Sequence, residues 1–500
     1  MVIEAVLLLL CAGAVYCARA WIRLRHVPGP PLAGWSPLWM IRKLLGGRAN
    51  EELHRVSELY GPLVRIGPND LLCTDPDTLR RIAGARSLYT KGAFYESGRI
   101  IPGYDNVVSQ RDEAKHKTLR AKMMAAYNGR ENGNTTDTSF ESGVDRQLLQ
   151  LIALIDTKYI SDHGTLRPFD LSAKSQFFSL DVISDMSFGS PFGFLTEDRD
   201  LYQFLEINDG AVPIMNVFQA MPWLTNAVQR WPLRLALPND GDNIGLGRLM
   251  GLSKSYVEER LRPGSKAGQD MLQGFINGGM SYDELVQHMF VQIVAGSITT
   301  ATAIRHTLLA VISTPTAYAT LQREIDSRMM MGLISSPIIT DAEALQFPYL
   351  QAVVREGLRM WPPTTGLGSK TVPRGGDVLC GFHVPEGTQI SHNFAGLMRL
   401  KDVWGEDADV FRPERWLPVP GKDGEHERLR IMGQVLDLDF GSGKYQCLGK
   451  RIALMELNKI FVELMRRYDF AIINPQNPIK SWSGIFWIAG DLWLRVTNRQ

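Results

Sequence analysis

The stretch FGSGKYQCLGK, residues 440–450, sets one cysteine, Cys447, among glycines and lysines. Glycine accepts backbone angles that other residues avoid, so such a loop can direct several backbone N–H groups at one acceptor. The segment that follows, residues 448–468, has the apolar spacing of a helix. Cys447 therefore lies at a predicted helix N-terminus, where we expect the helix dipole to lower the pKa of the thiol.

A stabilised thiolate in such a loop has three common uses: nucleophile, redox thiol and soft metal ligand. A nucleophile needs a base nearby, and no histidine lies within twenty residues of Cys447 in the sequence, although His426 is just outside that range. A redox thiol usually has a partner cysteine, and none is close in sequence. An axial ligand to heme iron needs only one shielded thiolate, so this use fits the pattern best.

The composition of the chain is that of an ordinary globular protein. Its 500 residues are 45% hydrophobic and 21% charged, and the formal net charge is +1, which gives no reason to expect nucleic acid binding. The five cysteines include no CxxC pair, which argues against a disulfide scaffold and a zinc site of the usual kind. No linker rich in proline, glycine or serine divides residues 36–500, so we expect one large domain there.

An apolar run, AVLLLLCAGAVYCA (residues 5–18), begins the chain, and basic residues follow it. With its neighbours the run approaches the ~20 residues that cross a bilayer. We therefore predict an uncleaved single-pass anchor over residues 1–22, with the body of the protein in the cytosol by the positive-inside rule. A cleaved signal peptide is the alternative. Residues 23–35 are basic and rich in proline, which predicts a stiff hinge.

Strand patterns are short and few. They occur at residues 63–67, 70–74, 371–390 and 484–496. In the last of these, Gly490-Asp491 predicts the turn of a hairpin. The polar segment 129–139 predicts a loop. Most of the remainder has helical periodicity, so the sequence predicts a mainly α fold with small β-sheets.

One predicted helix, residues 280–315, is unusually long and apolar almost all round in its middle, which predicts burial. Ser281 and Glu284 have the spacing of a capping box at its start. The middle reads AGSITT, and a glycine inside a helix costs about 1 kcal/mol relative to alanine. Either close packing of two helices explains Gly296, or a flat ligand lies there with the hydroxyl of Thr299 beside it.

A second predicted helix, FPYLQAVVREGLRMWPP (residues 347–363), begins at a proline and ends before two others. Glu356 and Arg359 share one face of it. Such a pair is a weak signal by itself, because surface pairs of this kind are common. Arg415, in the later motif FRPERW, could join the pair.

Taken in order, these motifs resemble those of the cytochrome P450 family, the heme-thiolate monooxygenases, and most closely its membrane-bound fungal members. The similarity covers nearly the whole chain: an anchor, a proline hinge, A-G-x-x-T-T, E-x-x-R, P-E-R and F-x-x-G-x-x-x-C-x-G. It implies a single large catalytic domain over residues 36–500 of the family's fold. It also implies heme b (iron protoporphyrin IX) as the cofactor, with no other metal.

The resemblance also implies an activity and its surroundings. The enzyme would activate dioxygen with electrons that come from NADPH through NADPH–cytochrome P450 reductase. It would oxidise a lipophilic small molecule in fungal secondary metabolism. It would be anchored in the endoplasmic reticulum membrane, with its catalytic domain in the cytosol.

The resemblance gives each motif residue an expected role. Cys447 is similar to the axial ligand of the heme iron, and Thr299 to the hydroxyl that steers protons during catalysis. The residues expected around that hydroxyl are Ala295, Gly296 and Thr300. The residues expected to contact the heme are Phe440, Gly443, Lys444, Tyr445, Cys447, Gly449, His116, Arg120 and Lys370. Glu356, Arg359 and Arg415 resemble the family's buried ion triad.

Three positions depart from the family's pattern. Tyr445 stands where most relatives have an arginine, and Lys370 offers a point charge where a guanidinium fork is usual. Ile298 occupies the place of an acid that relays protons. The relay would then run through Thr299, Thr300 and water.

Other interpretations stay open. One is an oxygen-independent heme-thiolate isomerase or dehydratase, which Thr299 argues against and Ile298 favours. Another is a non-enzymatic membrane heme-binding protein, which the complete set of motifs argues against. A basic surface is expected to dock the reductase, or else to be merely solvated. Its residues are Lys115, Lys117, Lys122, Lys444, Lys450 and Arg451.

Overall fold

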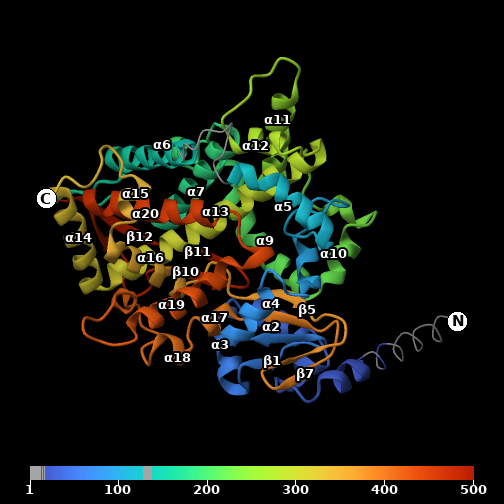
Figure 1. Ribbon diagram of the computed structural model, residues 1–500. Helices are drawn as coiled ribbons and strands as arrows, with labels where there is room; N and C mark the ends of the chain where they lie inside the picture. The colour runs from blue at the N-terminus through green and yellow to red at the C-terminus, as the bar shows by residue number, and fades with distance from the viewer. Residues whose placement is uncertain (1–12, 14, 16, 128–137, 500) are drawn as a thin grey trace.

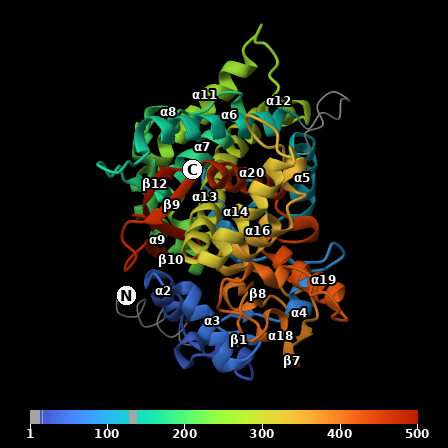
Figure 2. The same cartoon turned by 90° about the vertical axis from the view of Figure 1, so that its left-hand side faces the viewer.

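The computed structural model describes residues 13, 15, 17–127 and 138–499. Helices form most of this part of the chain, and the strands are short and gathered in small sheets (Figure 1). The predicted architecture, mainly α with small β-sheets, is confirmed. A second view shows a part rich in strands at one end of a large helical body (Figure 2).

The helices are α2 Leu38–Leu45, α3 Ala49–Tyr60, α4 Pro76–Ala83, α5 Glu113–Tyr127, α6 Thr138–Leu154, α7 Leu171–Phe188, α8 Phe194–Glu197, α9 Phe204–Ala220, α10 Pro222–Val228, α11 Gly245–Leu261, α12 Met271–Asn277, α13 Tyr282–Ser313, α14 Pro315–Met330, α15 Asp341–Ala344, α16 Pro348–Met360, α17 Phe394–Leu397, α18 Lys401–Trp404, α19 Glu425–Leu436 and α20 Lys450–Arg467. The strands are β1 Leu63–Arg65, β2 Asp70–Cys73, β3 Thr90–Lys91, β4 Phe169–Asp170, β5 Leu367–Thr371, β6 Asp377–Leu379, β7 Phe382–Val384, β8 Gln389–His392, β9 Tyr468–Ile472, β10 Lys480–Ser483, β11 Trp487–Gly490 and β12 Trp493–Asn498.

The longest of these helices, α13, runs through the centre of the helical body (Figure 1). The predicted capping box is present, because the Ser281 hydroxyl accepts from the backbone of Glu284 and the Glu284 carboxylate accepts from the backbone of Ser281. The helix spans 32 residues and ends just before Pro315, as predicted. Its main packing partner is α7, which is buried along almost its whole length.

The largest sheet has the strand order β1-β2-β8-β5-β3. Strand β2 pairs in parallel with β8, whereas its other neighbour, β1, is antiparallel. The predicted strands at 63–67 and 70–74 are therefore confirmed. The outer pair matters for the site, because β3 and β5 place Lys91 opposite Lys370.

The hairpin predicted at Gly490-Asp491 is wrong. Strand β11 pairs with β10, whereas β12 pairs with β9 and β4 in a different sheet. Asp491 does take a left-handed conformation (φ 58°), as a turn requires. The chain crosses there from one sheet to another instead of folding back.

The predicted anchor, residues 1–22, lies mostly outside the described residues, as does most of the predicted loop at 129–139. Among the helices that the structure does describe, none has the length and apolar character needed to traverse a bilayer. The segment after residue 22 packs on the body of the protein: Leu24 and Val27 are buried. The Arg65 guanidinium also donates to the carbonyl oxygens of Ala20 and Gly34, at 2.9 and 3.0 Å.

Candidate functional site

The middle of α13 has one accessible face. Ala295 is exposed and Thr299 is partly exposed, although residues 287–293 before them and 300–311 after them are buried. Residues four apart lie on one face of a helix, so Ala295 and Thr299 form one accessible face. The Thr299 hydroxyl donates to the Ala295 carbonyl oxygen at 2.9 Å. Thr300 points away from that face and is only 3% exposed, so the structure separates the two hydroxyls of the expected relay.

Gly296 serves helix packing. A Cβ atom at this position would lie 2.9 Å from Cγ1 and 3.0 Å from Cδ1 of Ile183 on α7. Of the two explanations of this glycine, the structure supports close packing of two helices. The expected place of Gly296 beside the Thr299 hydroxyl stays a prediction.

Replacement of Gly296 by alanine should destabilise the protein, because Ile183 and the new methyl group cannot share the space between α13 and α7. Overpacking of this kind costs about 1–3 kcal/mol. The double variant Gly296→Ala with Ile183→Ala should be at least 1 kcal/mol, roughly, more stable than the sum of the two single changes predicts. Thermal unfolding of the four proteins measures this coupling, and strictly additive effects would contradict the assigned contact.

Cys447 is held by the shape of its loop. Its backbone N–H donates to the Phe440 carbonyl oxygen at 2.7 Å, which closes the loop between α19 and α20. The residue is exposed, and its sulfur is the nearest atom to the position that a Cβ of Gly449 would occupy, at 4.0 Å. A side chain at Gly449 would thus lie beside the sulfur. Gly443 has a different function, since a Cβ there would lie 2.8 to 3.0 Å from the backbone of Ala83 and Ala85.

The expected lowering of the thiol pKa is wrong. Cys447 keeps accessible surface, but the protein atoms around its thiol still take water away and raise its pKa, and three favourable interactions offset this only in part. These are hydrogen bonds from the backbone N–H groups of Gly449 and Lys450 and the charge of Arg120. The helix start acts in the predicted direction, but the loss of water outweighs it.

Tyr445 joins two parts of the site. Its hydroxyl donates to Glu113 of α5, and the ammonium of Lys444 lies 2.6 Å from the same carboxylate. Its ring stacks at an angle on His116, with centroids 5.3 Å apart. The other neighbour of the ring is Lys370, whose Nζ lies 3.3 Å from the ring centroid. A tyrosine here therefore supports a lysine by a cation–π contact, which an arginine could not do.

Lys370 is the most informative residue of the site. It is 2% exposed, and its Nζ has no hydrogen-bond partner within the described chain. Burial strongly lowers the pKa of this ammonium, and the nearby charge of Lys91 lowers it further. A buried cation without a hydrogen-bond acceptor is costly. The group is therefore arranged to meet an anion.

His116 and Arg120 lie on α5, on the same side of the site. Arg120 donates from Nη1 to the Gln446 carbonyl oxygen at 2.7 Å, one residue before the cysteine. His116 is 4% exposed, and burial with the charge of Lys91 lowers its pKa to about 4. The imidazole is therefore neutral at pH 7 and can act as a hydrogen-bond donor rather than as a charge.

Lys91 and Tyr95, two residues beside Lys370, were not assigned to the site from the sequence. Lys91 is 4% exposed and donates to the carbonyl oxygens of Val107 and Val108, at 2.5 and 2.9 Å. Burial lowers its pKa to about 7. The Tyr95 ring lies 5.5 Å from Nζ of Lys370. The pairing of β3 with β5 brings this part of the chain to the site, and no local sequence motif predicts that pairing.

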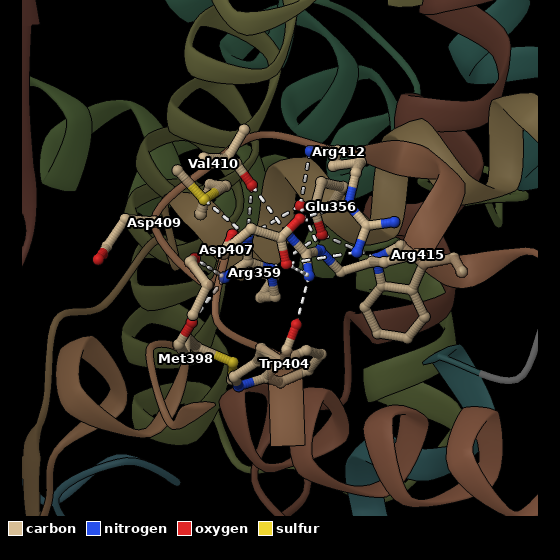
Figure 3. A network of polar contacts seen from close by, with 12 residues as sticks. Glu356, Arg359, Met398, Trp404, Asp407, Asp409, Val410, Arg412 and Arg415 are labelled. Carbon is tan, nitrogen blue, oxygen red and sulfur yellow. Dashed lines mark hydrogen bonds and ion pairs between the residues drawn. The ribbon is translucent and has the colours of Figure 1, made fainter. Parts of the chain in front are cut away.

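The Glu356 carboxylate is fully buried and accepts hydrogen bonds from two segments, α16 and residues 412–416 (Figure 3). Arg359 donates from Nε and Nη2, at 2.9 and 2.8 Å, and Arg415 donates from Nε at 2.8 Å. The Trp416 indole and the backbone N–H of Arg412 each add a bond of 2.9 Å. Burial alone would raise the pKa of Glu356, but Arg359 and then Arg415 hold it below its usual value.

The residues present fit a heme. Cys447 offers one accessible sulfur, as an axial ligand of iron requires. Lys370 offers a buried cation without an acceptor, which a heme carboxylate would satisfy. The accessible face at Ala295 and Thr299 provides a surface on α13 without large side chains. Without a ligand, the buried Lys370 ammonium is unfavourable, and the chain gives no reason for the accessible sulfur or the accessible face of α13.

Comparisons with known proteins agree with this description. A family model described as Cytochrome P450 matches residues 28–489. The chain is 39% identical over 504 residues to cytochrome P450 monooxygenase ABA1 of Pyricularia oryzae, covering 98% of this chain and 96% of that protein. It is 37% identical to cytochrome P450 monooxygenase aba1 of Botryotinia fuckeliana, covering 95% and 92%. It is 30% identical to cytochrome P450 monooxygenase cicH of Emericella nidulans, covering 94% and 92%. The resemblance inferred from the motifs is confirmed.

Proposed function

The chain belongs to the cytochrome P450 family, and from this premise we propose that it is a heme-thiolate monooxygenase of fungal secondary metabolism. Its substrate is a lipophilic small molecule, and its electrons come from NADPH through a reductase. The observation that carries the proposal is the accessible face of α13, where Ala295 and Thr299 keep accessible surface between two buried stretches of the helix, residues 287–293 and 300–311. A hydroxyl at that place serves proton delivery in oxygen chemistry, whereas an oxygen-independent isomerase has no need of it.

The chain's own groups have separable tasks. Cys447 would hold the iron, and Lys370 with Arg120 would hold the carboxylates of the heme. When bound, the heme supplies the activation of dioxygen for insertion of one oxygen atom into the substrate. Thr299 holds a proton at Oγ1, which the Ala295 carbonyl keeps in place through its 2.9 Å bond. Ile298 offers no proton, so we propose that water reaches Thr299 directly.

The surface suits a membrane and a reductase as partners. On α10 and just after it four large apolar side chains are exposed: Trp223 (62%), Trp231 (74%), Leu233 (57%) and Leu235 (74%). With the apolar N-terminal run, they support the proposed location at the endoplasmic reticulum membrane. Lys115 and Lys117 on α5 are exposed cations beside the Cys447 loop and would dock the reductase. Lys122, Lys444 and Lys450 are less available, since each lies 2.6 to 2.8 Å from a carboxylate.

The carbon monoxide difference spectrum of the reduced protein tests the proposed heme ligation. The native protein should give the red-shifted Soret band that a thiolate ligand produces, and Cys447→Ser should lose that band while keeping its fold. A native spectrum without it would exclude this function. Product formation that requires NADPH, reductase and dioxygen should then follow, and turnover without dioxygen would favour the isomerase alternative.

Thr299→Val should lower the amount of product formed per NADPH consumed by about tenfold or more, because positioned proton transfer typically contributes 10²–10⁴-fold. Thr302→Val is the matched control. The Thr302 hydroxyl makes the same local bond, to the Ile298 carbonyl at 2.9 Å, but Thr302 is fully buried. Equal effects of the two changes would show that the hydroxyl acts on the helix and not on the reaction.

A further inference from the structure

The guanidinium of Arg65, on β1, joins the N-terminal segment to the five-stranded sheet. The residue is buried, and its N–H groups donate to five backbone carbonyl oxygens. These belong to Ala20, Trp21, Gly34, Gly67 and Pro68, at 2.9 to 3.1 Å. Three of the five lie in the segment before α2, and two lie in the turn after β1. One side chain therefore fastens two parts of the chain that are distant in sequence.

Two of these carbonyl oxygens lie near the C-terminal end of a helical segment that ends at Leu24. Carbonyl groups in the last turn of a helix have no partner within the helix, and a cation beside them is favourable. Arg65 donates from Nη1 to Trp21 at 3.1 Å and from Nη2 to Ala20 at 2.9 Å. It thus caps the helical segment from the side of the sheet, which fixes the end of this helix against the body of the protein.

Two tryptophans pack beside the guanidinium. The rings of Trp21 and Trp35 stack with centroids 5.3 Å apart and an interplanar angle of 13°. A Cβ atom at Gly34 would lie 3.2 Å from both Nη1 of Arg65 and Cδ1 of Trp21. The glycine therefore lets the guanidinium, the indole and the backbone meet in one place.

The chain that follows the helical segment is fastened as well. Arg23 donates from Nη1 to Oδ1 of Asn69, in the turn after β1, at 3.2 Å. The backbone N–H of Arg65 donates to the Pro28 carbonyl oxygen at 2.7 Å. Prolines make this part of the chain stiff by themselves, and the two bonds join it to β1 at the edge of the sheet. The segment 20–35 therefore has a fixed direction relative to the body of the protein.

The surface beside this segment is apolar. Leu32 and Trp35 are exposed on the segment, and Leu38 and Leu45 are exposed at the two ends of α2. Helix α2 packs against α9, which leads directly into α10 and its exposed apolar side chains. Tryptophan is enriched where proteins meet the membrane–water interface. Since the apolar run of residues 5–18 comes just before this segment, the surface fits a lipid bilayer.

We propose that the Arg65 joint, formed by Arg65 and the segment 20–35, fixes the direction in which the apolar run leaves the body of the protein. The protein therefore binds a bilayer in one orientation, with the exposed apolar side chains of residues 32–45 at the lipid surface. Burial of a cation among neutral carbonyl groups is costly. A loose tether needs no such cation, whereas a fixed exit direction does. The orientation rests on the proposed membrane location, but the joint itself does not.

Limited proteolysis of the full-length protein tests the joint without a membrane. Trypsin cleaves after Arg19, Arg23 and Arg25 when the segment opens, so the cleavage rate follows the population of the open form. Arg65→Ala should raise this rate at least about tenfold, because five hydrogen bonds are lost. Cleavage should stay confined to residues 19–25, which distinguishes opening of the joint from unfolding of the protein.

Two further variants make this experiment decisive. Gly34→Val keeps Arg65 and the sheet but places a side chain between the guanidinium and Trp21, so it should open the segment even where Arg65→Ala fails to fold. Arg42→Ala is the matched control, since Arg42 is an exposed arginine on α2 outside the joint, and it should be cleaved as the native protein is. Cleavage of Gly34→Val and of folded Arg65→Ala at the native rate would overturn the joint.

The orientation on a bilayer tests the consequence. The full-length holoenzyme is reconstituted in oriented phosphatidylcholine bilayers, and the linear dichroism of the heme absorption gives the tilt of the body. The native protein should show one tilt, whereas Gly34→Val should lose most of the dichroism because its orientations are spread. Equal dichroism of the two proteins would overturn the fixed orientation. A native protein that does not float with phosphatidylcholine vesicles would overturn the membrane location and the orientation with it, while the proteolysis still decides on the joint.

Discussion

Replacement of Glu356 by glutamine should prevent folding or lower the free energy of unfolding by about 3–5 kcal/mol, the usual cost of removing one partner of a buried ion pair. The glutamine has nearly the same volume, so the change tests charge and not packing. It leaves the guanidinium groups of Arg359 and Arg415 buried, at 0% and 2% exposure, without a compensating anion. It also replaces a carboxylate oxygen that accepts hydrogen bonds by an amide NH₂ group, which would face the N–H donors of the two arginines.

A second Glu–Arg pair in the chain provides the control. Glu427 and Arg430 have the same spacing as Glu356 and Arg359, three residues apart on one helix, but their side chains are 58% and 53% exposed. Exposed pairs contribute about 0–1 kcal/mol, so Glu427→Gln should leave stability almost unchanged. Thermal unfolding and soluble yield of the two variants make the comparison. A Glu356→Gln protein as stable as the Glu427→Gln protein would contradict the network of Figure 3 as the support of this core.

The two Glu-x-x-Arg pairs, at 356–359 and 427–430, show what the sequence can predict and what it cannot. Glu-x-x-Arg is a local pattern, and helix geometry alone predicts that the two side chains share a face. Whether such a pair is buried depends on which segments cover it. Met398, Asp407 and Val410 surround the Arg359 and Arg415 guanidinium groups with acceptors, and none of them is part of a motif.

Elements with strong local signals were predictable, and contacts between distant strands were not. The ends of α13 follow from Ser281 and Pro315, and both were placed correctly. The hairpin at Gly490 failed because partners for β11 and β12 are chosen by packing against other sheets, not by the turn. Tyr445 was an unexplained departure for the same reason. Its partner Lys370 lies on β5, 75 residues earlier in the chain, so the sequence around Tyr445 does not show the contact.

Lys370→Met should have two effects of opposite sign, which makes it the most discriminating change at the site. Without heme, the variant should be more stable than the native chain by about 1–3 kcal/mol, because a buried amine without a hydrogen-bond acceptor is removed and this outweighs the loss of its cation–π contact with Tyr445. With heme, the variant should lose the cofactor at least about tenfold faster, because a charge-assisted bond to a carboxylate is missing. Methionine has a similar length, so packing against Tyr445 is retained.

The stability difference between the two apoproteins should also depend on pH. Burial lowers the pKa of Lys370, so the folded native chain binds fewer protons there than the unfolded chain does. The free energy of unfolding of the native apoprotein should therefore rise with pH toward the ordinary lysine pKa of 10.5. Lys91, whose pKa is about 7, adds to this rise in both proteins. The advantage of Lys370→Met should shrink as pH rises, because the native ammonium loses its proton.

Two measurements decide between an anion site and a merely buried lysine. Denaturation of the apoproteins gives the stability difference, and heme transfer to excess apomyoglobin gives the rate of cofactor loss. Lys401→Met is the surface control, since Lys401 is exposed and pairs with Glu406, and it should change neither quantity. A less stable Lys370→Met apoprotein would mean that the cation–π contact with Tyr445 outweighs the cost of burying the ammonium. Unchanged heme loss would mean that the carboxylates bind elsewhere, for example at Arg120 beside the Cys447 loop.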